Sequence, residues 1–461
     1  MGEAILCGQS GGGGIKINGI LERYGVYTGE TIKAGDFVDI VNVQTGTNEY
    51  TSTLTQISNT TYTGRLISAT LLSNNRIFMA HSGTSDNKLH GSLISIVNGE
   101  IIPHVTTLLK ESSYVYGGSS CVKALTLDDN HVFVIYCNTG NYTLESMILE
   151  VSSDSFSIVS ERQLCADDVS GELFDATVMS DGVVFVAHRY NSYYDYLYGT
   201  VVKIANNAVS SVYTNSLRQS DMYAYSDISV ARLSDTRVFI YSGYYGSKSY
   251  YGTAYFATLS GTTFTSRYSD YSTVKYVGRY HCAIPLDENR AFVACCYSTS
   301  YNLYGMVWSY NGSTISSGTA VALNSGDSTC SASPCAVMSQ SGNVVIFHPK
   351  SFSYNLYGVV ASISDMTVTK AGSNYELDLT SYCAYSPSAV VLDDGYIFVA
   401  YASGGTSSTY YLSGILYDEN FDNVIEIPVY EEQVQKTTTA QFDGIAKTGG
   451  SDGSTVSVYT L

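Results

Sequence analysis

The alternation of apolar and polar positions repeats one unit along most of this chain. Its clearest copy runs from Pro387 to Tyr401: a short apolar stretch, an Asp-Asp-Gly turn and a second stretch rich in β-branched and aromatic residues. Period-two alternation on both sides of a tight turn predicts a β-hairpin. Six further copies precede it, at residues 68–81, 122–137, 175–188, 229–242, 281–295 and 334–348.

The copies are evenly spaced. One position of the second predicted strand recurs every 52 to 55 residues, at Phe78, Phe133, Phe185, Phe239, Phe292, Val345 and Phe398. A period of this length, with room for about four strands, is typical of a β-propeller. A lone blade cannot cover both of its apolar faces, so neighbouring blades must supply the cover. The sequence therefore predicts an all-β chain with a seven-bladed β-propeller over residues 58–429, a fold that does not name a function by itself.

Both ends of the chain leave this repeat. Residues 1–20 form a Gly-rich segment, and its four consecutive glycines are not followed by the Lys-Ser/Thr of a phosphate-binding loop. Residues 21–57 and 430–461 alternate like short strands separated by Gly-rich turns. Because chain ends commonly lie close together, we expect them to form one small split β module with the propeller inserted between its halves.

Two segments of these ends resemble a known group of proteins. Phe442–Val458, FDGIAKTGGSDGSTVSV, resembles the closing segment of small β domains in virion proteins of tailed bacteriophages. Gly29–Val41, GETIKAGDFVDIV, is similar to the opening strands of the same domains, which occur in capsid-decoration and tail-associated proteins. The resemblance implies a structural protein of the virion, made in the host cytoplasm and placed at the tail, baseplate or capsid. It also implies attachment to other virion proteins through the terminal module, as a homo-oligomer in the particle.

Composition and charge restrict the partners. The net charge of −18 disfavours nucleic acid and anionic membranes, which both attract basic surfaces. No apolar run reaches about eighteen residues, so no membrane insertion is predicted, and no signal peptide is recognisable. The ten cysteines show no CxxC spacing, so we expect buried thiols without zinc and no cofactor, and leave open whether any of them pair.

The repeated charged residues favour structure over catalysis. The acids that recur in the repeats fall in hairpin turns, where Asp bonds its own backbone: Asp128, Asp129, Asp181, Asp235, Asp287, Glu288, Asp393 and Asp394. The Asp-box pattern of sialidases is absent, and no carboxylate pair for glycoside hydrolysis is singled out. His81, His188 and His348 share one strand position on different blades, so they are not expected to share a metal ion. We therefore predict that the chain is not an enzyme.

The loops after the second strands carry the candidate binding residues. They are rich in Tyr, Ser, Gly and Asn, the residues that binding loops favour, and Tyr faces also stack on sugar rings. They leave the blades opposite the Asp turns and should gather on one rim, while the Tyr of each Leu-Tyr-Gly motif begins the third strand. The expected ligand-binding residues are Tyr193, Tyr194, Asp195, Tyr245, Tyr250, Tyr301, Tyr354 and Tyr410.

The sequence leads to one main hypothesis and two alternatives. The main one is a tail- or baseplate-associated virion protein whose propeller binds a host surface component, a glycan before a protein, with weak contacts multiplied by copy number. The first alternative is a capsid or tail decoration protein with a purely structural role. The second is a glycan-cleaving enzyme.

Overall fold

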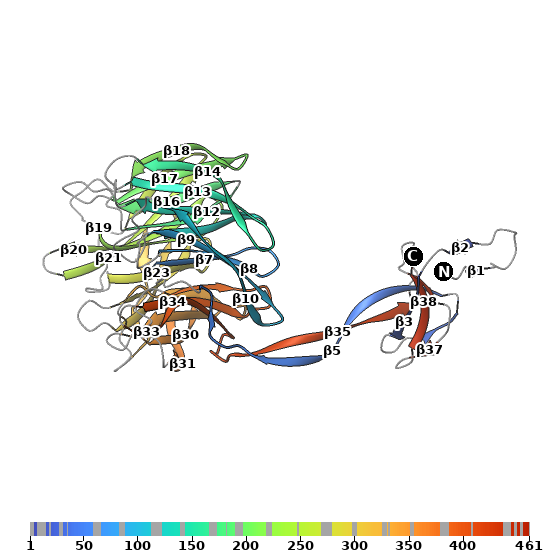
Figure 1. Cartoon of the computed structure of the whole chain (residues 1–461). Helices are drawn as coiled ribbons and strands as arrows, with labels where there is room; N and C mark the ends of the chain where they lie inside the picture. Colours follow the sequence, from blue (N-terminus) through green and yellow to red (C-terminus); the bar gives the residue numbers. More distant parts are fainter. Residues whose placement is uncertain are drawn as a thin grey trace. The chain divides into compact units, whose positions relative to one another are not determined.

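The computed structural model describes two compact units, Met1–Tyr50 with Glu426–Leu461 and Thr51–Ile425 (Figure 1). The residues it describes are 4–6, 15–17, 20–26, 31–34, 36–58, 66–82, 88–111, 122–138, 143–165, 173–180, 182–189, 197–217, 224–246, 249–268, 279–296, 302–324, 330, 332–350, 355–378, 387–406, 409–436, 444–446, 450–451 and 455–460. Every regular element among them is a β-strand. In this part of the chain there is no helix with the length and apolarity to cross a membrane.

The larger unit is a ring of seven antiparallel sheets, and the all-β, seven-bladed prediction is confirmed. Blades 1 to 3 contain β7 (Ile67–Leu71), β8 (Arg76–Ser82), β9 (Leu89–Val97), β10 (Glu100–Lys110); β11 (Val122–Asp128), β12 (His131–Asn138), β13 (Thr143–Val151), β14 (Phe156–Cys165); and β15 (Phe174–Val178), β16 (Val183–Arg189), β17 (Leu197–Ala205), β18 (Ala208–Ser216). Blades 4 and 5 contain β19 (Ala224–Arg232), β20 (Arg237–Gly246), β21 (Ser249–Ser260), β22 (Thr263–Tyr268); and β23 (Arg279–Pro285), β24 (Arg290–Cys296), β25 (Leu303–Tyr310), β26 (Ile315–Ser317), β27 (Val321–Ala322). Blades 6 and 7 contain β28 (Cys335–Met338), β29 (Val344–Pro349), β30 (Leu356–Ser364), β31 (Thr367–Asp378); and β32 (Ser388–Val391), β33 (Ile397–Thr406), β34 (Thr409–Tyr417), β6 (Thr55–Gln56).

The ring closes in two ways. The innermost strands touch in the order β7, β11, β15, β19, β23, β28 and β32, and β32 contacts β7 again. The last blade takes its outer strand from the other end of the propeller segment, since β6 pairs with β34. The backbone N–H of Ile57 also donates to the Leu412 carbonyl at 2.8 Å, and that of Leu416 to Ser52 Oγ at 3.1 Å. The first and last parts of the propeller segment are therefore joined in one sheet.

The core lies between the blades. Each large apolar cluster draws its side chains from two neighbouring sheets, as in the cluster that combines Phe78 of blade 1 with Val132 and Met147 of blade 2. The recurring second-strand position that revealed the repeat is fully buried in all seven blades. This burial explains why the sequence keeps an apolar residue there at every repeat.

The smaller unit is a closed β barrel built from both chain ends. Its strand order is β3-β35-β5-β36-β38, which comprises β3 (Ile20–Val26), β35 (Val424–Lys436), β5 (Phe37–Thr51), β36 (Gly444–Ala446) and β38 (Thr455–Thr460). Two short pairs accompany it: β1 (Ala4–Leu6) with β2 (Ile15–Ile17), and β4 (Thr31–Ile32) with β37 (Gly450–Ser451). Among the described residues its centre holds Val26, Ile32, Val38 and Val458.

Candidate functional site

The propeller has two unlike rims. The turn rim carries the hairpin turns between first and second strands, at 72–75, 128–130, 179–182, 233–236, 286–289, 339–343 and 392–396. The loop rim is the opposite end, where second strands end and the next first strands begin. Of the eight candidate binding residues, Tyr245, Tyr250 and Tyr410 lie in described strands at the loop rim.

In blade 4 the candidate segment is a strand pair and not an irregular loop. β20 and β21 continue as a ladder up to Gly246 opposite Ser249, and this ladder sets Tyr245 directly across from Tyr250. Figure 1 shows the two strands extending at the left edge of the propeller. Directly paired residues lie about 5 Å apart, so the backbone brings these two predicted residues together.

The other candidates are placed less fully. Tyr410 is the second residue of β34, next to Thr409, which pairs with Thr406 of β33. Its side chain falls outside the described part. The remaining five lie outside the described residues altogether: Tyr193, Tyr194, Asp195, Tyr301 and Tyr354.

The base of the blade 4 hairpin is rigid. A Cβ on Gly252 would lie 1.5 Å from the Tyr241 hydroxyl oxygen, so only glycine lets β21 cross this ring. Tyr241 is fully buried, and its ring meets His281 edge-on at 4.8 Å. Burial raises the pKa of Tyr241 well above its ordinary value. The extended hairpin therefore stands on a packed aromatic floor, which favours a fixed binding surface.

A buried polar cluster lies at the same rim under blades 4 to 6. The Ser333 hydroxyl donates to the Asp227 carboxylate, and Ser229 Oγ shares a 2.7 Å hydrogen bond with His281 Nδ1. All four side chains are at most 7% exposed. Burial lowers the pKa of His281, while the charges of Asp227 and Asp175 act in the opposite direction. The cluster ties the starts of three blades together below the rim.

The backbone beside this cluster is unusual. Tyr280 has a φ of 48° at a bulge between Arg279 and His281, in a region that bulky residues rarely occupy. Sequence reasoning missed the cluster, but a signal was available. His281 stands where the other repeats have Ile67, Val122, Phe174, Ile228, Pro334 and Pro387.

The second-strand histidines are structural. His81 Nε2 bonds Ser92 Oγ at 2.9 Å, and His188 Nε2 bonds Thr200 Oγ1 at 2.8 Å; each hydroxyl then bonds a Thr on the fourth strand. Burial lowers the pKa of His81 to about 3 and that of His188 to about 4. Among the described residues no three His, Cys, Asp or Glu side chains are grouped to hold a metal ion.

The turn rim is held by regular contacts between blades. Arg76, 9% exposed, donates to the Ser152 carbonyl at 2.7 Å and to the Asp129 carbonyl at 2.8 Å, so it joins blade 1 to two turns of blade 2. Arg237 reaches the turn of blade 5 in the same way, with its Nη1 donating to Asn289 Oδ1 at 2.5 Å.

The acids of these turns bond their own backbone. Asp128 accepts the N–H of Asn130 at 2.9 Å, and Asp287 accepts that of Asn289 at 2.8 Å. Burial acts to raise the pKa of both carboxyls, but these and neighbouring hydrogen bonds outweigh it and lower the pKa below its ordinary value. The interpretation as turn formers is confirmed for Asp128 and Asp287, whereas Asp181 lies outside the described residues.

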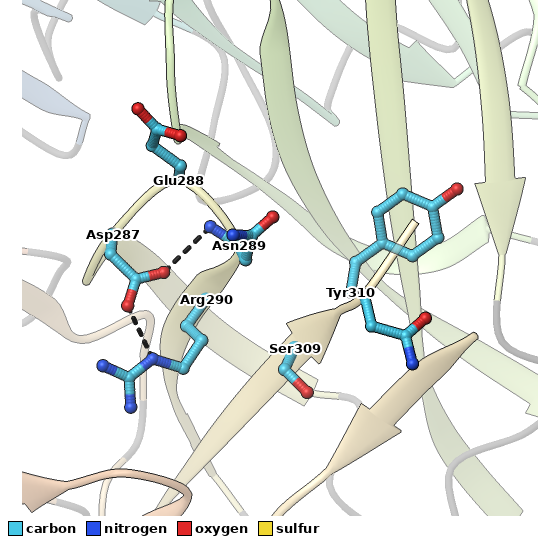
Figure 2. Close-up of a pocket in the computed structure, with 7 residues that line it drawn as sticks. Asp287, Glu288, Asn289, Arg290, Ser309 and Tyr310 are labelled. Carbon is cyan, nitrogen blue, oxygen red and sulfur yellow. Dashed lines mark hydrogen bonds and ion pairs between the residues drawn. The ribbon is translucent and has the colours of Figure 1, made fainter. Parts of the chain in front are cut away.

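A cavity of about 570 Å³ also opens on the turn rim of blade 5 (Figure 2). Figure 2 shows Asp287 bonded to Arg290, with Ser309 and Tyr310 at the end of the neighbouring strand β25. Arg290 is further engaged by the Asp365 carbonyl at 2.7 Å. The Tyr310 ring is stacked on Phe256, with centroids 5.2 Å apart, and the Arg237 guanidinium lies 5.6 Å from its centroid. These side chains are thus already committed to contacts between blades, which makes the cavity a weaker binding candidate than the loop rim.

The fold defines the class: the chain is a seven-bladed β-propeller whose two ends also build a small closed barrel. No family model matches the sequence, and no curated protein matches it. Among solved structures it is similar to a mutant of AofleA from Arthrobotrys oligospora, with 10% identity over 90% of this chain and 94% of that one, at a TM-score of 0.45. It is similar to the β-propeller domain of the Trilobed protease from Pyrococcus furiosus, with 9% identity over 78% and 97% at a TM-score of 0.40. It is also similar to the NanB sialidase from Streptococcus pneumoniae, with 12% identity over 82% and 70% at 0.41.

Proposed function

We propose that this chain is a phage virion protein that binds a host surface glycan through the loop rim of its propeller. The barrel formed by the chain ends attaches it to other virion proteins at the tail or baseplate. The binding surface comprises the blade 4 hairpin and the neighbouring Tyr-rich loops. The proposed activity is glycan binding, without a chemical reaction on the glycan.

The attachment half of the proposal rests on how the two resembling segments pair. Gly444 and Ile445 of the C-terminal segment pair with Val38 and Phe37 of the N-terminal one, and β37 pairs with β4. Segments far apart in the chain, each similar to one part of a phage β domain, are thus hydrogen-bonded to each other in the barrel and in a two-stranded sheet. Such a domain fits a role in joining the chain to a particle.

The binding half is supported by the blade 4 hairpin. The ladder of β20 and β21 pairs Tyr245 with Tyr250, and β20 also contains the buried Tyr241. Aromatic side chains on a rigid support bind with little loss of conformational entropy, and their faces suit the apolar faces of sugars. Single contacts of this kind are weak, and many copies on one particle would raise the avidity.

The binding test uses the labelled full-length protein on bacterial envelope fractions and on an array of surface polysaccharides. We expect retention by wild type and a loss of at least tenfold in Tyr245→Ala/Tyr250→Ala. Lys203→Ala, an exposed residue near the turn rim, is the matched control and should bind like wild type. Equal binding by both variants, or none by wild type, would contradict the proposal.

Two further measurements separate the alternatives. New reducing ends after incubation with the bound polysaccharide would indicate a glycan-cleaving enzyme. Particles that carry the Tyr245→Ala/Tyr250→Ala protein and adsorb normally would favour a decoration role. Deletion of residues 437–461, which removes two strands of the barrel, should prevent incorporation into particles while the propeller stays folded.

A further inference from the structure

Five thiols belong to blades 5 and 6 or to the segment between them. They are Cys282, Cys295, Cys296, Cys330 and Cys335, and each lies in or against an apolar cluster of these blades. All five are reduced in the structure. Within the described chain they do not form a metal-binding group.

Two of these thiols share one hydrogen-bond acceptor. Cys330 Sγ lies 2.9 Å and Cys296 Sγ 3.9 Å from the carbonyl oxygen of Ala332, toward which both thiols donate. Because both sulfurs approach the same oxygen atom, they lie close to each other. Cys296 ends the second strand of blade 5, whereas Cys330 bridges to Lys350 at the end of the second strand of blade 6. They are at most 1% exposed, so their proximity is fixed by packing.

Cys330 differs from its neighbours in reactivity. Burial raises the pKa of Cys282, Cys295 and Cys296 above the ordinary value. At Cys330 burial acts in the same direction, but hydrogen bonds with Cys296 and His348 and the charge of His348 outweigh it, and the pKa is lowered. The thiolate is the reactive form of cysteine, so Cys330 is the thiol of this group most prone to attack an oxidant.

We propose that Cys296 and Cys330 are a redox-active pair that a peroxide converts into a disulfide between blade 5 and the segment leading into blade 6. The Cys330 thiolate attacks one oxygen of hydrogen peroxide, forming an S–O bond while the O–O bond breaks and hydroxide leaves. Cys296 then loses its proton and attacks the Cys330 sulfur, forming the S–S bond and releasing water. Two thiols lose two electrons in total, and one peroxide becomes two waters.

The bond would act as a staple under the loop rim. It closes a loop of the chain that contains β25, β26 and β27, and so limits the freedom of the unfolded state. For a chain of this length we expect an increase in the unfolding temperature of about 4 °C. This inference does not depend on the proposed binding function, because it concerns a different group of residues.

The first experiment counts thiols by mass. Reduced full-length protein is treated with hydrogen peroxide, denatured and labelled with N-ethylmaleimide. Of the ten cysteines, eight should be labelled after oxidation and all ten after dithiothreitol. Trypsin would leave both cysteines on one peptide, because no Lys or Arg lies between Arg290 and Lys350. Chymotrypsin cuts at Tyr297 and so separates Cys295 and Cys296 from Cys330 and Cys335, and the variants then assign the bond within each pair.

Variants assign the pair. Cys330→Ala should keep all of its nine thiols at the same peroxide dose, whereas Cys295→Ala, the matched control beside Cys296, should lose two as wild type does. Cys296→Ala should instead form a sulfenic acid on Cys330 that binds one dimedone. The proposal would be overturned by labelling of all ten thiols in oxidised wild type, by a bond between other cysteines, or by an unchanged unfolding temperature. These three measurements use the wild-type protein, so they do not depend on whether a variant folds.

Discussion

The two rims of the propeller differ in how far their contacts repeat from blade to blade. At the turn rim similar contacts recur: in blades 2 and 5 an acid bonds its own turn, and in blades 1 and 4 an arginine, Arg76 or Arg237, contacts the next blade. At the loop rim the blades differ, with a long Tyr hairpin in blade 4 and a buried Asp227–Ser333 contact at blades 4 to 6.

This difference separates stability from function within one chain. Blades that meet the same structural demand use similar residues, so this rim reports how blades are joined. At the loop rim the equivalent positions of the blades carry different residues, so they are not under that shared demand. These positions can together form a binding surface. Recognition is therefore expected where the repeat breaks down.

The largest effect is expected from Gly252 at the loop rim. An alanine there would place its Cβ 1.5 Å from the hydroxyl oxygen of Tyr241, whose ring is fully buried. Gly252→Ala should therefore lower the free energy of unfolding by about 4 kcal/mol. Gly261→Ala in the blade 4 turn is the control. Its Cβ would meet nothing within 4 Å, and the φ of +61° alone should cost about 1 kcal/mol. Urea unfolding measures the free energy of unfolding of both variants. Equal losses would show that close packing between Gly252 and Tyr241 does not stabilise the protein.

The next effect concerns the clamps of the turn rim. Arg76→Ala removes a nearly buried guanidinium and leaves carbonyls of blade 2 without their donor, so it should destabilise the protein by about 3 kcal/mol. Arg232→Ala is its counterpart, because Arg232 pairs with Asp235 in an exposed ion pair and should cost less than about 1 kcal/mol. A similar loss for both arginines in urea unfolding would mean that the clamp at Arg76 contributes no more than a surface charge.

The comparison of rims also explains what the sequence could predict. The fold was accessible because burial imposes the same apolar position on every blade, from Phe78 to Phe398. The turns were accessible because Asp at Asp128 or Asp287 has a local partner two residues on. Both signals are local or periodic, and a single sequence displays them openly.

Contacts between positions that are far apart in the sequence and occur only once in the ring produce no local or periodic pattern in the sequence. The use of β6 to complete the blade of β34 joins residues more than 350 positions apart through only two paired residues. The Asp227–Ser333 contact and the convergence of Cys296 and Cys330 on one carbonyl depend on how blades 4, 5 and 6 are placed in the ring. Spacing along the chain says nothing about them until the ring is built.

The smallest of the three effects tests the buried histidines of the loop rim through pH. His188 is fully buried with a pKa of about 4, whereas an unfolded histidine titrates near 6.5. Above pH 6.5 the imidazole of His188 is neutral in both the folded and the unfolded state. As the pH falls from 6.5 to 4, only the unfolded state takes up a proton, so the free energy of unfolding decreases across this range. At pH 5 the loss from this one residue is about 2 kcal/mol. His188→Gln, which can still bond Thr200, should therefore show a smaller drop in unfolding free energy between pH 7 and pH 5 than wild type, by that amount. His104→Gln is the control for removing an exposed histidine. If wild type and His188→Gln lose the same unfolding free energy between pH 7 and pH 5, the buried imidazole of His188 does not contribute to the acid sensitivity of the protein.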